Sequence, residues 1–128
     1  MKKFVITGAP NAGKTTIVDE LSKKGYAFLS ETSRILIDTQ KIFPWDNQEL
    51  FCEEFRKLQI MREAKLEGDI IFLDQSLVDP LAYAAIDECS INPSIYDDIR
   101  KAKYENDVFF LEMLSDYSMD QERLDTRE

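Results

Sequence analysis

Residues 8–15 read Gly8-Ala9-Pro10-Asn11-Ala12-Gly13-Lys14-Thr15, and this stretch decides the fold of the chain. It matches the P-loop pattern G-x-x-x-x-G-K-[ST], whose glycines let backbone N–H groups turn inward around an anion. The apolar run Phe4-Val5-Ile6-Thr7 before it predicts a short buried strand, and the apolar spacing of Ile17, Val18 and Leu21 after it predicts a helix. A strand, a glycine loop and a helix N-terminus in this order indicate a phosphate-binding site.

The side chains of this motif indicate which phosphate compound binds. Lys14 can reach the β- and γ-phosphates of ATP, and the Thr15 hydroxyl can ligate Mg²⁺. We therefore predict ATP and Mg²⁺ as cofactors, with these residues holding the nucleotide: Gly8, Ala9, Pro10, Asn11, Ala12, Gly13, Lys14, Thr15 and Thr16. The alternative interpretation is an ordinary glycine-rich turn between a strand and a helix.

Composition places the chain among single-domain globular proteins. Its 128 residues are 44% hydrophobic and 32% charged, so we treat residues 1–128 as one domain. The net charge of −9 argues against a nucleic-acid partner, since such proteins neutralise phosphates with basic side chains. No apolar run approaches the length that spans a membrane, so no membrane partner is expected.

The absence of histidine and the small number of cysteines limit the catalytic chemistry and the cellular location that we expect. The sequence has no histidine, which excludes histidine bases, Ser/His triads and histidine metal sites. Any general base is therefore a carboxylate or water. Cys52 and Cys89 are the only cysteines, and beside a nucleotide motif they predict reduced thiols in a cytoplasmic protein.

Strand patterns alternate with helix patterns along the chain. We predict strands at residues 4–7, 26–30, 70–73 and 108–111, and helices from the P-loop to 24, over 33–41, over 46–68, and starting near 80 and 93. In the longest helix Asp46 is the predicted N-cap, and the predicted buried face carries Phe51, Phe55, Leu58 and Met61. This alternation predicts an α/β fold with a parallel sheet, in which ligands bind beyond the C-terminal ends of the strands.

Polar residues follow the second and third predicted strands. Asp74 comes directly after the apolar run 70–73, which is the Walker B position for a carboxylate that holds Mg²⁺. Alternatively, Asp74 or Ser76 caps the next helix. Glu31 and Arg34 would share a helix face, where Glu31 can orient a substrate hydroxyl or accept its proton and Arg34 can bind an anionic or polar group. The alternative for this pair is a capping acid and a solvated arginine.

Motifs spread over the whole chain together resemble one family. They are the P-loop, Glu31-x-x-Arg34, the Phe43-Pro44 turn, Gln59 in the long helix, Asp74 followed by Asp79-x-x-x-Tyr83, and Asp120-x-x-Arg123. In this order they look like the P-loop ATP-binding domains related to nicotinamide riboside kinase, which in turn resemble deoxynucleoside and nucleoside monophosphate kinases. The resemblance implies a three-layer P-loop NTPase fold, whose mainly parallel sheet has the strand order 2-3-1-4 and usually a fifth strand.

The same resemblance implies roles for residues outside the P-loop. It places Glu31 as the base or the ligand of the substrate hydroxyl, and it places Gln59 against a nucleobase. Arg123 belongs to a lid motif that supplies arginines to the transferring phosphoryl group. On the residues alone, Gln59 can instead be a surface residue, and Tyr83 and Trp45 can be packing residues.

Two features depart from the family pattern. Gln75 follows Asp74 where the family often has an arginine, so one positive charge near the phosphates is absent. The chain also stops at Glu128, where the lid motif ends, whereas the family pattern continues into a helix and a fifth strand. We therefore expect a domain truncated after the lid, with 108–111 as an edge strand that favours self-association or leaves the monomer marginally stable.

Together these observations predict an ATP-dependent small-molecule kinase that transfers the γ-phosphoryl group to a hydroxyl of a nucleoside-like acceptor. The residues assigned to catalysis are Lys14, Glu31, Arg34 and Arg123, those assigned to the metal are Thr15 and Asp74, and those assigned to the substrate are Glu31, Arg34 and Gln59. The alternatives are an ATP-hydrolysing or nucleotide-sensing module without an acceptor, and a non-enzymatic interaction protein that keeps only the nucleotide pocket.

Overall fold

A four-stranded parallel sheet lies at the centre of the computed structural model, which describes residues 1–8 and 13–111. Its strands are β1 (Lys2–Gly8), β2 (Ala27–Leu29), β3 (Ile70–Leu73) and β4 (Tyr104–Leu111). Their order across the sheet is β2-β3-β1-β4, and every neighbouring pair runs parallel. The predicted α/β fold and its 2-3-1-4 strand order are therefore confirmed.

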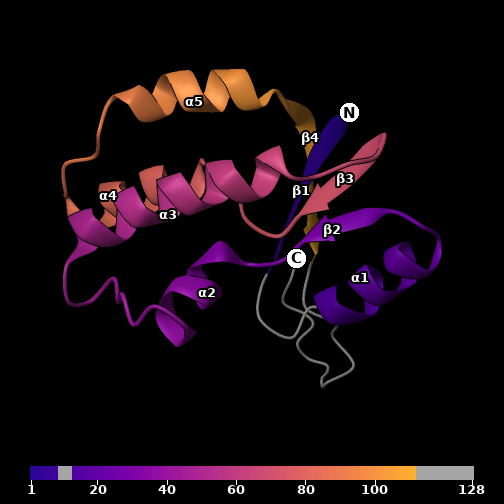
Figure 1. Cartoon of the computed structure of the whole chain (residues 1–128), viewed down its shortest axis with the longest axis horizontal. Coiled ribbons are helices and arrows are strands. Elements are labelled where there is room, and N and C mark those ends of the chain that lie inside the picture. Colours follow the sequence, from indigo (N-terminus) through magenta and orange to yellow (C-terminus); the bar gives the residue numbers. More distant parts are fainter. Residues whose placement is uncertain (9–12, 112–128) are drawn as a thin grey trace, which may run out of the picture.

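Helices flank this sheet on both sides. Within the described ranges they are α1 (Lys14–Lys23), α2 (Thr32–Asp38), α3 (Gln48–Ala64), α4 (Asp79–Asp87) and α5 (Ser94–Ala102). Figure 1 shows α1 on the other side of the strands from α3, α4 and α5. Cover on both sides explains why the predicted strands are short apolar runs, since each strand needs hydrophobic side chains on both of its faces.

The longest helix differs from its predicted bounds at both ends. α3 begins after Asn47 rather than Asp46, because the Asn47 side chain accepts a hydrogen bond from the Leu50 N–H at 3.0 Å. It ends at Ala64, well before Gly68, whose φ of 128° belongs to the loop that leads into β3. The N-cap prediction was therefore wrong by one residue, since neighbouring Asp and Asn are equally good caps by type and only the backbone decides between them.

Buried residues of α3 change character along the helix. Phe51 and Phe55 pack against α2 in the first half and are 1% and 0% exposed. In the second half Met61, predicted to be buried, is 49% exposed. The buried positions there are taken by two polar residues, Gln59 and Glu63. The inner stripe of α3 is therefore apolar at one end and polar at the other.

One face of the sheet supports the C-terminal end of α3. Leu29, Ile71 and Leu73, from β2 and β3, form a buried cluster. Val5 of β1 and Leu66, just beyond α3, pack against this cluster. The apolar runs predicted to be strands thus supply the layer between the sheet and α3.

The opposite face of the sheet is aromatic. Phe4 lies level with Phe72 in the register of β1 and β3, and their stacked rings have centroids 5.8 Å apart. Phe109 adds a third ring 5.6 Å from Phe4, yet it stays 47% exposed. Its strand, β4, begins at Tyr104 rather than Val108 and lies at one edge of the described sheet, as expected. Self-association through this edge stays a prediction.

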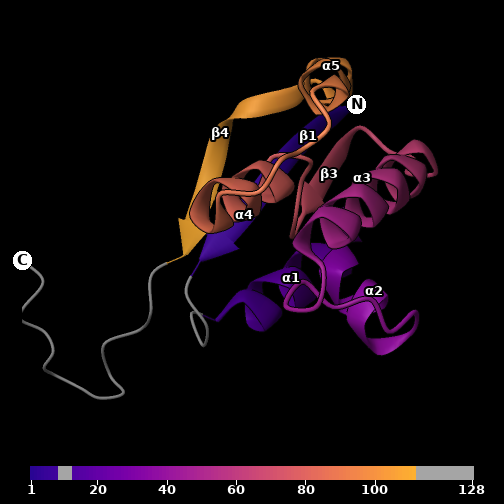
Figure 2. The ribbon, with the colours of Figure 1, turned by 90° about the vertical axis from the view of Figure 1, so that its left-hand side faces the viewer.

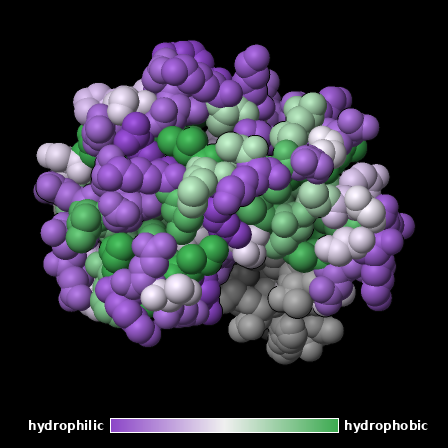
Figure 3. All heavy atoms as spheres, viewed as in Figure 1, coloured by the Kyte–Doolittle hydropathy of each residue, from purple (hydrophilic) through white to green (hydrophobic). Residues whose placement is uncertain are grey.

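Hydrophilic and hydrophobic side chains are unevenly spread over the outer surface. Hydrophilic side chains cover most of the upper part of the face seen in Figure 3, with smaller hydrophobic groups between them. In the part of the chain that the structure describes, no helix is both long enough and apolar enough to cross a membrane.

The α3 core generates a stability prediction. Phe55→Ala should lower the free energy of unfolding by about 3–5 kcal/mol, because Phe55 is fully buried and the change leaves a cavity. Met61→Ala, on the same helix but half exposed, is the matched control and should cost far less. Urea denaturation followed by circular dichroism measures both. Equal losses would contradict the packing described for α3.

Candidate active site

The first loop of the chain leads from the end of β1 into α1. β1 ends at Gly8, and Gly13 is the N-cap of α1 in a left-handed conformation, with φ of 85° and ψ of 17°. This conformation favours glycine, because a Cβ would be strained there. The predicted order of strand, loop and helix is confirmed. Residues Ala9, Pro10, Asn11 and Ala12 of the predicted nucleotide site lie outside the described residues.

The parallel sheet brings the three predicted site segments to one edge. In Figure 2 the arrowheads of β1 and β4 point to the end of the molecule where α1 and α2 lie. Because all pairs are parallel, Gly13 after β1, Glu31 after β2 and Asp74 after β3 lie beyond the same ends of the strands. This is the edge at which α/β sheets bind ligands.

A backbone hydrogen bond to the neighbouring strand β2 holds Asp74 at that edge. Its N–H donates to the Leu29 carbonyl at 2.9 Å, so Asp74 extends β3 beside the end of β2. α4 starts only at Asp79, and the cap position is Val78. Asp74 is therefore not the N-cap of α4, and the capping alternative fails for this residue. The Ser76 Oγ does accept from the Val78 N–H at 3.1 Å, in the turn before the helix.

The residue types at this edge suit a magnesium ion that is also bound by the phosphates of a nucleotide. Thr15 is the second residue of α1 and Asp74 follows β3, and hydroxyl and carboxylate oxygens are hard ligands of the kind that Mg²⁺ prefers. Among the described residues no group of three or more acidic or thiol side chains could hold a metal ion. A site with few protein ligands fits Mg²⁺, which usually keeps waters and substrate phosphates around it.

Glu31 and Arg34 lie on one face of α2, as their spacing predicted. The Arg34 Nη2 is 3.7 Å from the Glu31 Oε1, and the Arg34 side chain is mostly exposed. Glu31 occupies the N-cap position of α2, but its carboxylate makes no capping hydrogen bond. The capping interpretation of Glu31 therefore does not hold. α2 itself starts at Thr32 and ends at Asp38, shorter than the predicted 33–41.

Gln75 has a structural role at the position where the resembled kinases often carry arginine. Its side chain is 7% exposed, and its Oε1 accepts a hydrogen bond from the Ser33 N–H at 2.9 Å. Its Nε2 lies 3.5 Å from the Tyr83 hydroxyl. Gln75 thus accepts a hydrogen bond from a backbone N–H in the first turn of α2 and connects this turn to α4. It brings no positive charge to the edge of the sheet.

Gln59, expected to contact a substrate, is buried instead and 0% exposed. Its Nε2 donates to the Glu63 Oε2 at 2.8 Å and to the Gln75 carbonyl at 2.9 Å. Its Oε1 accepts a short hydrogen bond from the Thr32 hydroxyl. Spacing offered a signal, since Gln59 stands four residues after Phe55 and therefore on the buried stripe. Its amide holds helices together and does not line the pocket described next.

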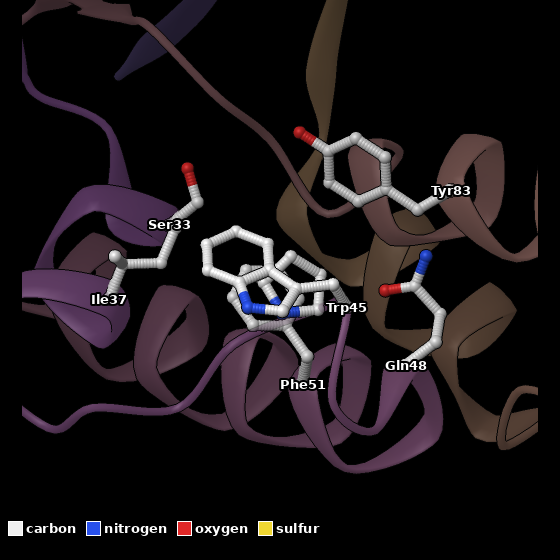
Figure 4. A pocket seen from close by; sticks show the side chains of 7 residues that line it. Ser33, Ile37, Trp45, Gln48, Phe51 and Tyr83 are labelled. Carbon is white, nitrogen blue, oxygen red and sulfur yellow. The ribbon is translucent and has the colours of Figure 1, made fainter.

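A pocket of about 380 Å³ opens between α2, the loop before α3, and α4. Its lining is mostly apolar and aromatic, with Ser33 and Gln48 as the polar members: Ser33, Ile37, Pro44, Trp45, Gln48, Phe51 and Tyr83. Figure 4 shows Ser33 and Ile37 on one side, Gln48 and Tyr83 on the other, and the indole of Trp45 between them. No charged side chain is part of this lining.

Sequence reasoning missed this pocket because its aromatic residues have ordinary packing explanations. Trp45 stacks on Phe43, another residue of the loop before α3, with ring centroids 5.0 Å apart. Yet Trp45 is 72% exposed, so its indole is available to a ligand. Tyr83 packs edge-on against Phe51, with centroids 6.5 Å apart, and also contributes a hydroxyl. The proline and tryptophan pair at 44–45 was the one available sequence signal.

The pKa of the Tyr83 hydroxyl is raised by its surroundings. Burial raises the pKa of Tyr83 above its usual value, and the negative charges of Asp79 and Glu31 raise it further. Tyr83 therefore stays protonated at neutral and moderately alkaline pH and can donate a hydrogen bond.

The nucleotide site generates a prediction for its lysine. Lys14→Ala should abolish ATP binding or turnover and leave the circular dichroism spectrum unchanged, because a P-loop lysine faces the phosphates rather than the core. Lys23→Ala, at the other end of α1 and largely exposed, is the matched control and should bind ATP normally. Titration with ATP measures both. Unchanged ATP affinity in a folded Lys14→Ala variant would refute the P-loop assignment.

Comparison with known proteins supplies the family. A family model described as an AAA domain matches residues 3–128, almost the whole chain. A comparison with curated proteins found no match. Arg123 lies within the matched range but outside the residues that the structure describes. The parallel sheet, the Gly13–Lys14 helix start and this match agree, and the chain belongs to an AAA domain family of P-loop nucleotide-binding proteins.

Proposed function

We propose that this AAA domain binds ATP with Mg²⁺ and transfers the γ-phosphoryl group to a hydroxyl of a nucleoside-like acceptor. The observation that carries the proposal is the aromatic pocket, because its lining residue Ser33 lies in the first turn of α2, two residues after Glu31, and α2 follows β2 at the sheet edge that also receives the end of β1. The pocket volume of about 380 Å³ falls within the usual range for small-molecule sites.

The chemistry of the pocket suits a planar ring. The aromatic faces of Trp45, Phe51 and Tyr83 can stack on a heterocycle, and the Ser33 hydroxyl and Gln48 amide can hydrogen-bond to its edge. With the ring so placed, the sugar of a nucleoside would extend toward the first turn of α2. Glu31 stands at that turn.

Glu31 is the base in this proposal. Its carboxylate accepts the proton of the acceptor hydroxyl as the hydroxyl oxygen forms a bond to the γ-phosphorus. The bond from the γ-phosphorus to the bridging oxygen breaks, and ADP leaves with the electron pair. Lys14, Arg34 and Arg123 offset the negative charge of the phosphates. Bound Mg²⁺, for which Thr15 and Asp74 are the proposed ligands, would neutralise charge on the phosphate oxygens.

An ATP-hydrolysing or nucleotide-sensing module is the second candidate, and Gln75 favours it. In the resembled kinases an arginine often stands at this position, and an arginine acting on phosphates can be worth about 10³-fold or more in rate. Here the neutral side chain of Gln75 hydrogen-bonds to Ser33 and Tyr83, so this position supplies no positive charge to the phosphates. Slow or absent transfer would be the consequence if no other arginine compensates.

The proposal also includes partners and location. The acceptor is a small molecule, and the net charge of −9 gives no support to a nucleic-acid partner. A cytoplasmic location agrees with the use of ATP, and self-association through the edge of β4 remains part of the proposal.

Acceptor-dependent release of ADP tests the kinase proposal. With Mg²⁺ and ATP present, a panel of nucleosides and pyridine ribosides should contain at least one compound that raises ADP release well above the rate without acceptor. Trp45→Ala should raise the KM for this acceptor about tenfold without changing the KM for ATP, because the indole lines only the pocket.

Tyr96→Ala is the matched control for Trp45, since Tyr96 is an exposed aromatic residue on α5, away from the pocket. Trp45 is also the only tryptophan of the chain, so its fluorescence reports acceptor binding directly. Steady ADP release that no acceptor accelerates would favour hydrolysis. ATP binding without any turnover would favour the non-enzymatic interpretation.

Two carboxylates should separate in their effects. Glu31→Gln should lower kcat about 10²- to 10⁴-fold and leave the affinity for Mg-ATP nearly intact, because the amide cannot accept the proton. Asp74→Asn should instead weaken the dependence of ATP affinity on Mg²⁺. Calorimetry with and without Mg²⁺ measures the second effect. Equal effects of both changes on Mg-ATP affinity would contradict this division of roles.

A further inference from the structure

Arg62 of α3 makes contacts on both sides of Glu31. Its Nη1 donates to the Ser30 carbonyl at 2.9 Å and to the Thr32 hydroxyl at 2.7 Å, and its Nη2 donates to the Ser30 hydroxyl at 3.1 Å. Ser30 and Thr32 are the residues directly before and after Glu31 in the chain. One guanidinium thus holds the turn between β2 and α2 at two points.

These contacts are unusual for an arginine in so acidic a chain. The sequence has 25 acidic residues, and both Arg56 and Arg100 pair with aspartates. Within the described residues no carboxylate pairs with Arg62, and its hydrogen bonds go to neutral oxygens. Burial without an anion also lowers the pKa of its guanidinium. Arg62 is thus a partly buried arginine whose hydrogen bonds within the described residues all go to Ser30 and Thr32.

The turn needs support from outside, because the elements that flank it are short. β2 has three residues and α2 has seven, and a helix of that length is marginal without tertiary contacts. Two further side chains help Arg62. Gln59 accepts from the Thr32 hydroxyl, and Gln75 accepts from the Ser33 N–H.

Glu31 itself is left out of this support. Its carboxylate makes no capping hydrogen bond, and its ion pair with the exposed Arg34 is long, at 3.7 Å. Side-chain hydrogen bonds thus hold the residues before and after Glu31, whereas the Glu31 side chain is 37% exposed and, among the described residues, makes only a long ion pair. This is the arrangement expected of a reactive group placed by its surroundings.

We propose that Arg62 is a positioning residue, which holds the turn between β2 and α2 so that the Glu31 carboxylate meets the acceptor hydroxyl. The inference rests on the proposed kinase function. Arg62 touches neither nucleotide nor acceptor in this proposal, and it acts only through Glu31. A misplacement of about 1 Å at a reacting group can cost about 100-fold in rate, so the loss of this support should be measurable.

Kinetics of Arg62 variants test the proposal. Arg62→Met keeps the stem of the side chain and removes the fork, and it should lower kcat for the acceptor reaction about 10- to 100-fold. The KM for ATP and the fluorescence response of Trp45 to the acceptor should stay unchanged. Arg62→Lys keeps the charge but has no guanidinium fork to reach Ser30 and Thr32 together. Its kcat should therefore lie between those of the wild type and of Arg62→Met. Arg100→Met, an exposed arginine on α5, is the control and should have normal kcat.

A double variant separates positioning from a general loss of structure. If Arg62 acts only through Glu31, then Arg62→Met should have no further effect on kcat in a Glu31→Gln background. Effects that multiply, or a normal kcat in Arg62→Met, would overturn the inference while acceptor-dependent ADP release by the wild type still supported the kinase proposal.

Hydrogen exchange gives a readout that does not depend on activity. Amides of residues 30–33 should exchange faster in Arg62→Met than in the wild type or in Arg100→Met, whereas those of β3 should not change. Unchanged exchange at 30–33 would overturn the inference even if no acceptor were ever found. Faster exchange with no acceptor-dependent ADP release would mean that Arg62 supports the turn and that the kinase proposal itself has failed.

Discussion

The buried carboxylate of Glu63 is the constraint on which much of this structure depends. It is 5% exposed, and a charge so placed is tolerated only if donors surround it. Three do: the Lys3 Nζ at 3.1 Å, the Gln59 Nε2 at 2.8 Å and the Tyr104 hydroxyl at 2.7 Å. These donors come from β1, α3 and β4, so one side chain ties the long helix to two strands.

The same network continues to the candidate site. Gln59 joins Glu63 to the Thr32 hydroxyl at the start of α2 and to the Gln75 carbonyl after β3. Tyr104 also accepts a hydrogen bond from the Leu77 N–H at 3.0 Å, before α4. Burial raises the pKa of Tyr104 far above its usual value, and the Glu63 charge adds to the effect, so its hydroxyl remains a donor. The start of α2, the segment after β3 and the turn before α4 are thus connected through one set of buried and partly buried hydrogen bonds.

This connection limits what evolution or mutation can change at the site. A buried network in which one member is removed leaves its neighbours unsatisfied, at about 1–3 kcal/mol for each neutral group and more for a charge. The hydrogen bonds of Gln59 and Gln75 within the protein therefore restrict substitution at these two positions. In the kinases that the sequence resembles, the corresponding positions can carry functional residues. Functional residues of this chain are better sought among those outside the network, such as Glu31, Asp74 and Trp45.

The strand order was expected from the resemblance to a kinase family. The sequence by itself determined the parallel α/β sheet and the order of strand, loop and helix at the nucleotide motif. These follow from local signals such as the apolar run 70–73 and the glycine at position 13. Such signals predict structure correctly where interactions between residues close together in the sequence determine the local backbone conformation. The shared face of Glu31 and Arg34 was predictable for the same reason, since a spacing of three places both on one side of a helix.

Only the tertiary structure decided which side chains face one another across elements. Gln59 became a buried connector, and Trp45 and Tyr83, from segments 38 residues apart, came to line one pocket (Figure 4). Arg62 came to hold the turn before α2 for the same reason. A side chain's type states what it can bond to, but burial and hydrogen-bond geometry depend on which elements the fold packs together. That packing is a property of the whole chain, and no single segment of the sequence contains it.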